Sequence, residues 1–196
     1  DRSPSRGLGD VYKRQVLEKV YNAASQKAGH GAKGLAFQGA VVTAQQYMKE
    51  VQEFGDAKAL TKARRTAYDP LVYRPLRQAL GGRARWIVAG GAPLDPELLS
   101  FFRGAGVPVY EGYGLTETTA PCAFTPIGVP FREGSVGIAF PAFTLRIASD
   151  GEVQIKGTCV FHKYHKNDEA TETSFTKDGW YATGDLGRID DDGMLY

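Results

Sequence analysis

The first part of the chain alternates apolar and polar residues with the period of an α-helix. Apolar residues recur at positions i, i+3, i+4 and i+7 in the run Ala44, Tyr47, Met48 and Val51. Because polar residues stand between them, this run predicts an amphipathic helix that ends near Gly55. A second apolar stripe follows Pro70, is closed by two glycines, and predicts another helix: Val72, Leu76, Ala79 and Leu80, before Gly81 and Gly82.

The pattern changes to strand, helix and strand between about residues 84 and 111. Residues 84–89 form a short apolar run that predicts a buried strand, and residues 107–111 predict a second strand. Between them, Asp95 is a suitable N-cap and Pro96 suits the first position of a helix that Gly104 and Gly106 would stop. This order is typical of a parallel α/β sheet.

Beyond Thr125 the pattern becomes β-rich. Apolar residues alternate on both sides of Asp150–Gly151, which predicts a hairpin, and residues 167–173 predict a short helix. We therefore expect an α/β fold: part of a parallel-sheet α/β subdomain over residues 16–126, then a small, incomplete β-rich subdomain over residues 127–196, either a distorted barrel or a sheet.

We expect that neither end of the chain is a native terminus. Residues 1–15 carry turn residues without periodicity, and Val11–Gln15 resembles translated sequencing-adaptor sequence, so we interpret this segment as a non-native tail. At the other end, Met194–Tyr196 predicts the first residues of a strand. A strand that stops after its first residues predicts a truncated polypeptide. Together with the interpretation of residues 1–15, we expect truncation at both ends.

Composition and charge exclude several classes of function. The 196 residues are 42% apolar and 23% charged, with a formal net charge of +2, which describes a globular chain without the basic excess that nucleic-acid binding needs. No apolar run reaches the roughly 18 residues of a membrane-spanning helix, and the chain does not start with a secretory signal. We expect a cytoplasmic protein.

The cysteines and histidines do not predict a metal site. Cys122 and Cys159 lie outside any CxxC spacing, which argues against a disulfide framework and a structural zinc, and predicts buried or half-buried free thiols. His162 and His165 could in principle provide two metal ligands. Packing within a strand or turn is favoured, because no acidic or histidine cluster nearby completes a site.

Three glycine-bearing segments fall at the ends of predicted strands, where open α/β sheets place their ligands. The first holds Gly90, Gly91, Ala92 and Pro93, whose small side chains would let a flat ring approach the backbone, although a tight turn would select the same residues. The second covers residues 111–118, and the third covers residues 179–187. The members of the second are Glu111, Gly112, Tyr113, Gly114, Leu115, Thr116, Glu117 and Thr118.

The residue types in the second and third segments are those that a nucleotide would need. Tyr113 can stack on a base, Thr116 can donate to a phosphate oxygen, and Glu117 is the hard oxygen ligand that Mg²⁺ prefers beside phosphates. Asp185 could accept two hydrogen bonds from a ribose. Taken alone, Thr116, Glu117 and Asp185 are more simply explained as residues of surface turns. The chain contains neither GxxxxGK[ST] nor GxGxxG, so neither a P-loop kinase nor a dinucleotide-binding dehydrogenase is supported.

Taken in order, these segments resemble the adenylate-forming superfamily of acyl-CoA synthetases, adenylation domains and beetle luciferases. The most specific match is residues 113–117, supported by residues 90–94 before it and by residues 151–157 and 181–186 after it. The resemblance covers nearly everything from Val16 to Tyr196. Residues 20–24 and 73–92 are most similar to bacterial long-chain fatty-acid CoA ligases.

The resemblance implies a role for each matching residue. Gly90, Gly91, Ala92 and Tyr113 would form the adenine pocket, within an ATP- and AMP-binding set that also includes Pro93, Glu111, Gly112, Gly114 and Leu115. Asp185 would hold the ribose. Thr116 and Glu117 would be catalytic, the first contacting the α-phosphate and the second holding Mg²⁺. The implied substrates are a long-chain fatty acid, ATP and coenzyme A, in a cytoplasmic protein that could contact the membrane peripherally.

The sequence also departs from the family pattern. These residues contain no Ser/Thr/Gly-rich phosphate loop with its lysine, and none of the C-terminal domain that carries the adenylation lysine. Lys163 stands where the family commonly has glycine, so the local turn is expected to differ. We therefore expect this polypeptide to turn over no substrate. The alternatives left open are a fatty-acyl-AMP ligase, a carrier-loading adenylation domain, and a non-catalytic nucleotide- or acyl-binding module.

Overall fold

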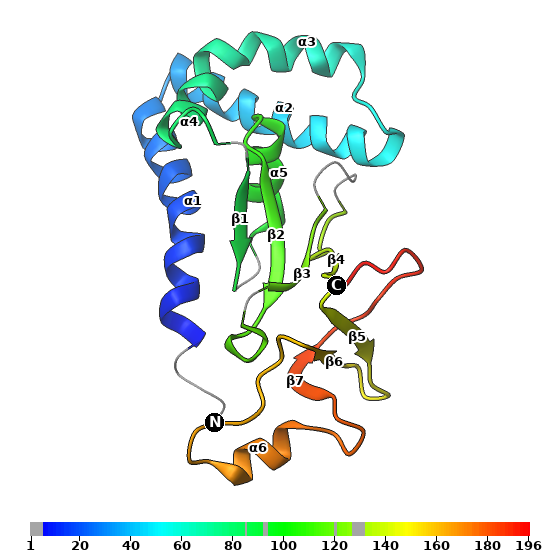
Figure 1. Cartoon of the computed structure of the whole chain (residues 1–196). Coiled ribbons are helices and arrows are strands. Elements are labelled where there is room, and N and C mark those ends of the chain that lie inside the picture. The colour runs from blue at the N-terminus through cyan, green and yellow to red at the C-terminus, as the bar shows by residue number, and fades with distance from the viewer. Residues whose placement is uncertain (1–5, 85, 92–93, 120, 127–131) are drawn as a thin grey trace. The chain divides into compact units, whose positions relative to one another are not determined.

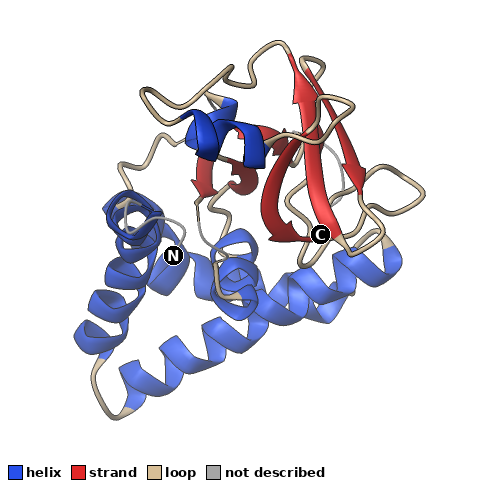
Figure 2. Cartoon of the chain, turned by 90° about the horizontal axis from the view of Figure 1, so that it is seen from below, coloured by secondary structure: helices blue, strands red, loops and turns tan. Residues whose placement is uncertain are grey.

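A computed structural model describes residues 6–84, 86–91, 94–119, 121–126 and 132–196 (Figure 1). These residues fall into two compact units, Asp1–Tyr110 with Pro130–Glu133, and Glu111–Val129 with Gly134–Tyr196. Most of the described helices belong to the first unit, and most of the described strands belong to the second (Figure 2). The expected mixture of helices and sheets is confirmed.

The described helices of the first unit include those that the apolar stripes of the sequence predict. They are α1 (Arg6–Ala28), α2 (Ala32–Phe54), α3 (Ala59–Tyr68), α4 (Arg74–Ala79) and α5 (Pro96–Gly104). As expected, α2 ends at Gly55, whose positive φ of 77° lets its N–H bond the carbonyl of Val51 at 2.9 Å. Residues 6–15 of the segment interpreted as a tail lie in α1, and residues 1–5 lie outside the described residues.

The helix expected after Pro70 is divided in two. A π-helical turn, η1 (Asp69–Tyr73), precedes α4, and the N–H of Arg74 bonds the carbonyl of Asp69. Pro75 has no N–H to continue the α-helical ladder, which is the physical reason for the wider turn here.

A strand, α5 and a second strand form the predicted α/β unit. The strands are β1 (Ile87–Gly90) and β2 (Val109–Gly114), which run parallel (Figure 1). Asp95 caps α5 as expected, because its Oδ1 accepts the N–H of Leu98 at 2.9 Å. The prediction that β1 is buried was wrong. Val88 is exposed, since β1 is an edge among the described strands of its sheet.

The core of the first unit lies where α2 packs on α5. Tyr73, Phe101, Phe102 and Leu99 are almost fully buried there, with the small residues Ala40 and Ala44 of α2. The small residues let the two helix backbones approach closely, so the bulky side chains of α5 can fill the space beside α2.

The second unit is built on antiparallel pairs. After β2 the sheet continues with β3 (Pro121–Phe124) and β4 (Ile138–Ala139), in the order β1-β2-β3-β4. A second sheet has the order β5-β6-β7, formed by β5 (Phe143–Ile147), β6 (Glu152–Gly157) and β7 (Tyr181–Leu186). The predicted hairpin is confirmed, with Leu145 opposite Ile155 and Ile147 opposite Val153. Of the two forms expected here, the described residues make an open sheet and no closed barrel.

Two features complete the second unit. The short helix expected over residues 167–173 is α6 (Asp168–Ser174), with Asn167 as its N-cap. The small core contains Cys122, Ala123, Val153, Ile155 and Leu195. The boundary expected near residue 126 and the observed division after Tyr110 differ, because β3 pairs with the end of β2 and so joins residues 111–124 to the second unit.

Candidate functional site

The segment of residues 111–118 forms the end of β2 and a tight turn. The pairing of β2 with β3 shifts register between Tyr113 and Gly114, after which the chain enters the 3₁₀ turn η2 (Thr116–Thr118). The buried Thr118 closes this turn, because its Oγ1 accepts the N–H of Leu115 at 2.9 Å and donates to the carbonyl of Leu115 at 2.9 Å. Thr118 therefore fixes the backbone that carries Thr116 and Glu117.

Glycine at position 112 keeps β2 close to its neighbour. A β-carbon there would lie 3.3 Å from both the carbonyl oxygen of Ala123 and the ring of Phe124, which is tighter than ordinary packing. Gly112 is buried. Glu111 is half-buried, and its carbonyl accepts the N–H of Thr125 at 3.0 Å. These two residues thus shape the strand that presents Tyr113.

Tyr113 and Asp185 are brought together from positions 72 residues apart. The Tyr113 hydroxyl donates to Oδ2 of Asp185 at 2.6 Å. Burial, reinforced by this bond to a carboxylate, raises the pKa of Tyr113 well above its ordinary value, so the phenol is a neutral donor. The predicted base-stacking ring and the predicted ribose acceptor therefore share one place in the second unit.

Hydrogen bonds within the sheet hold the strand segment around Asp185. The N–H of Asp185 donates to Oγ1 of Thr183 at 3.1 Å, and the Thr183 hydroxyl donates to the carbonyl of Val153 at 2.7 Å. The side chain of Glu152 accepts the N–H of Gly184 at 2.7 Å. These contacts fix β7 on β6 directly beside the carboxylate.

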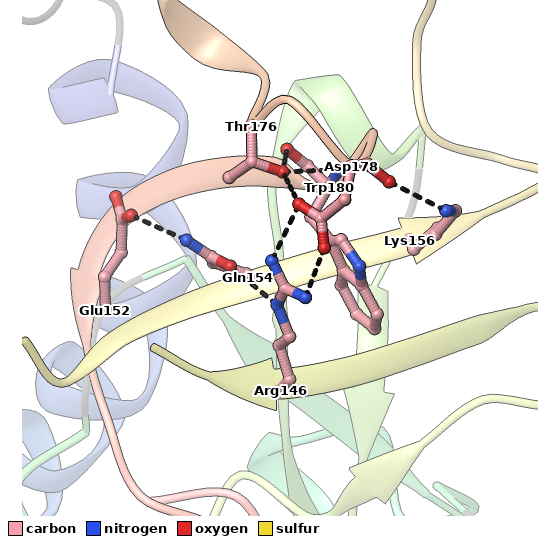
Figure 3. Close-up of polar contacts among 7 residues, drawn as sticks. All are labelled: Arg146, Glu152, Gln154, Lys156, Thr176, Asp178 and Trp180. Atoms are coloured by element: carbon pink, nitrogen blue, oxygen red, sulfur yellow. Dashed lines mark hydrogen bonds and ion pairs between the residues drawn. The ribbon is translucent and has the colours of Figure 1, made fainter. Parts of the chain in front are cut away.

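A polar network on β5 and β6 secures the turn that leads into β7 (Figure 3). Arg146 makes paired hydrogen bonds of 2.7 and 3.1 Å to Asp178, and its guanidinium lies 4.3 Å from the ring centroid of Trp180. The same guanidinium donates to Gln154 at 2.7 Å. The Asp178–Gly179 turn is therefore held against the sheet, which positions the strand that carries Asp185.

Thr116 and Glu117 differ in exposure. Thr116 is exposed, whereas Glu117 is half-buried and accepts the hydroxyl of Tyr164 on Oε1 at 2.8 Å. The carbonyl of Glu117 also accepts the N–H of Phe161 at 2.8 Å. Glu117 is thus held from both its side chain and its backbone by the segment that follows β6.

The donor set at Glu117 fits one kind of magnesium site. No group of three or more His, Cys, Asp or Glu residues that could hold a metal ion occurs in the described part of the chain. Mg²⁺ in phosphate-transferring sites is commonly held by one or two carboxylates together with substrate phosphates. Glu117 therefore fits Mg²⁺ that arrives with a nucleotide, rather than a resident ion.

The glycine segment after β1 belongs to the first unit. Gly90 ends β1, and Gly91 has a φ of 94°, a conformation that side chains rarely adopt, so the turn itself requires a glycine here. Ala92 and Pro93 lie outside the described residues.

Sequence reasoning missed three residues of the site. Thr118, Thr183 and Tyr164 position the candidate residues, but isolated hydroxyls give no periodic signal. Lys163 has no positive φ, so its turn does not need the family's glycine.

The histidines and cysteines partly differ from expectation. His162 and His165 are exposed rather than packed, because their loop runs over the surface. Cys122 is buried as expected, with its pKa raised to about 11 by burial, whereas Cys159 is exposed.

None of the described helices combines the length and apolar character needed to cross a membrane.

Comparisons with known proteins place this geometry in context. The family described as AMP-binding enzyme matches residues 24–165. The long-chain-fatty-acid–CoA ligase FadD15 of Mycobacterium bovis is 46% identical over 181 residues, which are 92% of this chain and 30% of that protein. The chain therefore spans about a third of the length of this relative.

Two solved structures are similar as well. Apo MatB from Rhodopseudomonas palustris has a TM-score of 0.56 and 30% identity, over 65% of this chain and 28% of that one. O-succinylbenzoate coenzyme A synthetase (MenE) from Bacillus subtilis, in complex with ATP and magnesium ion, has a TM-score of 0.52 and 31% identity, over 63% of this chain and 29% of that one.

Proposed function

This chain belongs to the AMP-binding enzyme family, and on that premise we propose that it supplies the nucleotide-binding segments of a long-chain fatty-acid CoA ligase. In the proposed reaction, a carboxylate oxygen of the fatty acid attacks the α-phosphorus of ATP, and the bond to pyrophosphate breaks. The thiol of coenzyme A then attacks the acyl carbon and displaces AMP. The 46% identity to a long-chain-fatty-acid–CoA ligase over 92% of the chain supports this substrate class.

The hydrogen bond between Tyr113 and Asp185 is the observation that carries the proposal. It joins an aromatic ring and a carboxylate at 2.6 Å, and adenine and ribose are likewise adjacent within one nucleoside. The ring of Tyr113 offers a stacking face, and Asp185 can accept the ribose hydroxyls once its bond to the phenol is exchanged. Gly90, Gly91, Ala92 and Pro93 are proposed to complete the adenine pocket.

Thr116 and Glu117 are proposed to act on the phosphates. The exposed Thr116 hydroxyl would donate to an oxygen of the α-phosphate, at the atom where charge develops during attack. Glu117 would hold Mg²⁺, which when bound neutralises phosphate charge as pyrophosphate leaves. Glu111, Gly112, Gly114 and Leu115 would shape the strand and turn that place these groups, and apolar residues near Gly112 would border the acyl chain.

Calorimetric titration with a non-hydrolysable acyl-adenylate mimic tests this function. We expect saturable binding by the chain, and about a tenfold or greater loss in Asp185→Asn, because hydrogen bonds to a charged acceptor contribute about 1.5–3 kcal/mol. Asp191→Asn is the matched control, since Asp191 is an exposed carboxylate on the loop after β7. Equal affinity in all three proteins would refute the assignment of Asp185.

The acyl group of the mimic tests the substrate class. A palmitoyl mimic should bind more tightly than an acetyl mimic if apolar residues of this chain border the fatty chain. Equal affinities would favour a nucleotide-binding module instead. Incubation with palmitate, ATP, Mg²⁺ and coenzyme A should yield no thioester, because the chain contains no phosphate loop and no adenylation lysine of the family pattern. We propose a cytoplasmic location for the ligase.

A further inference from the structure

The loop after β6 is bound to the turn that carries Glu117 at three points. The hydroxyl of Tyr164 donates to Oε1 of Glu117 at 2.8 Å, and the N–H of Phe161 donates to the carbonyl of Glu117 at 2.8 Å. A third bond of 2.9 Å runs from the hydroxyl of Thr119 to the carbonyl of Cys159. The bond from Phe161 holds the backbone of the turn, the bond from Thr119 ties a side chain of the turn to the loop, and only the bond from Tyr164 orients the carboxylate itself.

Tyr164 is itself held in place. Its ring packs on Phe161 with 4.6 Å between centroids, and Phe161 packs in turn on Phe175 and Tyr181, each at 5.4 Å. The N–H of Tyr164 donates to Oγ1 of Thr171 at 3.0 Å. An aromatic cluster and a backbone bond therefore fix the phenol that reaches Glu117. Burial, together with the bond to Glu117, raises the pKa of Tyr164, which keeps it a donor.

We propose that Tyr164 is a positioning residue for Glu117, holding one carboxylate oxygen so that the other is presented to the Mg²⁺ that accompanies the nucleotide. This inference rests on the proposed function. Carboxylates that ligate metals are commonly hydrogen-bonded by a second layer of residues, whose loss lowers metal affinity about 10–100-fold. Within the described residues, no group of three or more His, Cys, Asp or Glu side chains is available to share the binding of the ion with Glu117.

The test measures how much Mg²⁺ strengthens ATP binding. The affinity of the chain for ATP is measured by calorimetry with excess Mg²⁺ and again with a chelator, and the ratio of the two gives the enhancement by Mg²⁺. In Tyr164→Phe we expect that ratio to fall about tenfold, toward the ratio of Glu117→Gln, with the affinity in chelator unchanged. A purely structural role of Tyr164 would instead lower both affinities.

Tyr196→Phe is the matched control, because Tyr196 also donates its hydroxyl to a carboxylate, Asp190, at 3.2 Å elsewhere in the same unit. It should keep the wild-type ratio. The hydrogen bond is checked separately by the NMR signal of the Tyr164 ring carbon that bears oxygen, which should shift in Glu117→Gln without any nucleotide.

The outcomes separate the two proposals. An unchanged Mg²⁺ enhancement in Tyr164→Phe, or an unshifted Tyr164 signal in Glu117→Gln, overturns the positioning role and leaves the proposed function standing. A wild-type chain that binds ATP in neither buffer overturns the proposed function, and the positioning role with it.

Discussion

Gly104 is the position where the packing of the first unit makes its most specific prediction. A β-carbon at Gly104, in the last turn of α5, would lie 2.6 Å from the carbonyl carbon and 2.7 Å from Cα of Ala44 in α2, and closer still to the carbonyl oxygen. These are backbone atoms in the middle of a long helix, so they cannot rotate away. In Gly104→Ala the two helices must therefore separate.

The size of the effect follows from two opposing contributions. Overpacking a core typically costs about 1–3 kcal/mol, and an immovable backbone neighbour places this site at the upper end of the range. Alanine is a better helix former than glycine by up to about 1 kcal/mol. We expect Gly104→Ala to lower the free energy of unfolding by about 2 kcal/mol, a substantial part of the roughly 5–15 kcal/mol of a typical domain.

Gly39→Ala is the matched control for this substitution. A β-carbon at Gly39 would meet the tip of the Tyr68 side chain, with the ring carbon that bears oxygen at 3.1 Å, and that side chain can move. Gly39→Ala should therefore cost less than Gly104→Ala, and Tyr68→Phe should reduce its cost further. Ala44→Gly should not rescue Gly104→Ala, because the obstacle is the backbone of Ala44 rather than its methyl group.

Urea unfolding followed by far-ultraviolet circular dichroism is the suitable assay, since most helices belong to the first unit. A change of less than about 0.5 kcal/mol in Gly104→Ala would refute the reasoning, because that is the range of substitutions which disturb no packing. Rescue by Ala44→Gly would refute it as well.

Three further predictions concern stability. The buried Tyr73 donates to the carbonyl of Ala40 at 2.7 Å, and burial raises its pKa to about 12, so its contribution is complete below pH 10 and is lost between pH 10 and about 12. Urea titrations across this range should show an alkaline loss that is about 3 kcal/mol smaller in Tyr73→Phe than in the wild type; equal losses in both proteins would contradict the assignment. Ile155→Ala removes a fully buried side chain and should cost about 3 kcal/mol in urea unfolding, whereas a loss below about 1 kcal/mol would mean that the second sheet packs little there. Arg146→Lys keeps the charge but loses the paired hydrogen bonds and the stacking on Trp180; Trp180 fluorescence should report a lower urea midpoint, and an unchanged midpoint would show that the clamp adds no stability.

Local pattern was enough to predict most elements of the fold. The end of α2 at Gly55, the cap of α5 at Asp95 and the hairpin at Asp150–Gly151 all depend on residues close in sequence, whose backbone preferences act over a few positions. The π-helical turn before α4 depends on Pro75, a local signal that the apolar stripe concealed.

The candidate site was predictable only as separate segments. Tyr113, Glu117 and Asp185 can be recognised as candidates in the sequence, because stacking, cation binding and ribose recognition need particular functional groups. The residues that hydrogen-bond them cannot be recognised in the sequence, since Tyr164 lies 47 residues from Glu117 and an isolated tyrosine has no periodicity.

The sequence by itself determined the helix that ends at Gly55, the strand, helix and strand around α5, the hairpin at Asp150–Gly151 and the chemical groups available for a nucleotide. Only the tertiary structure decided which groups meet: Tyr113 with Asp185, and Glu117 with Tyr164. It also decided that β1 is an exposed edge and that β3 joins the end of β2 to the second unit. The physical reason is that backbone propensity acts between neighbours in the chain, whereas pairing and burial depend on contacts between residues distant in sequence.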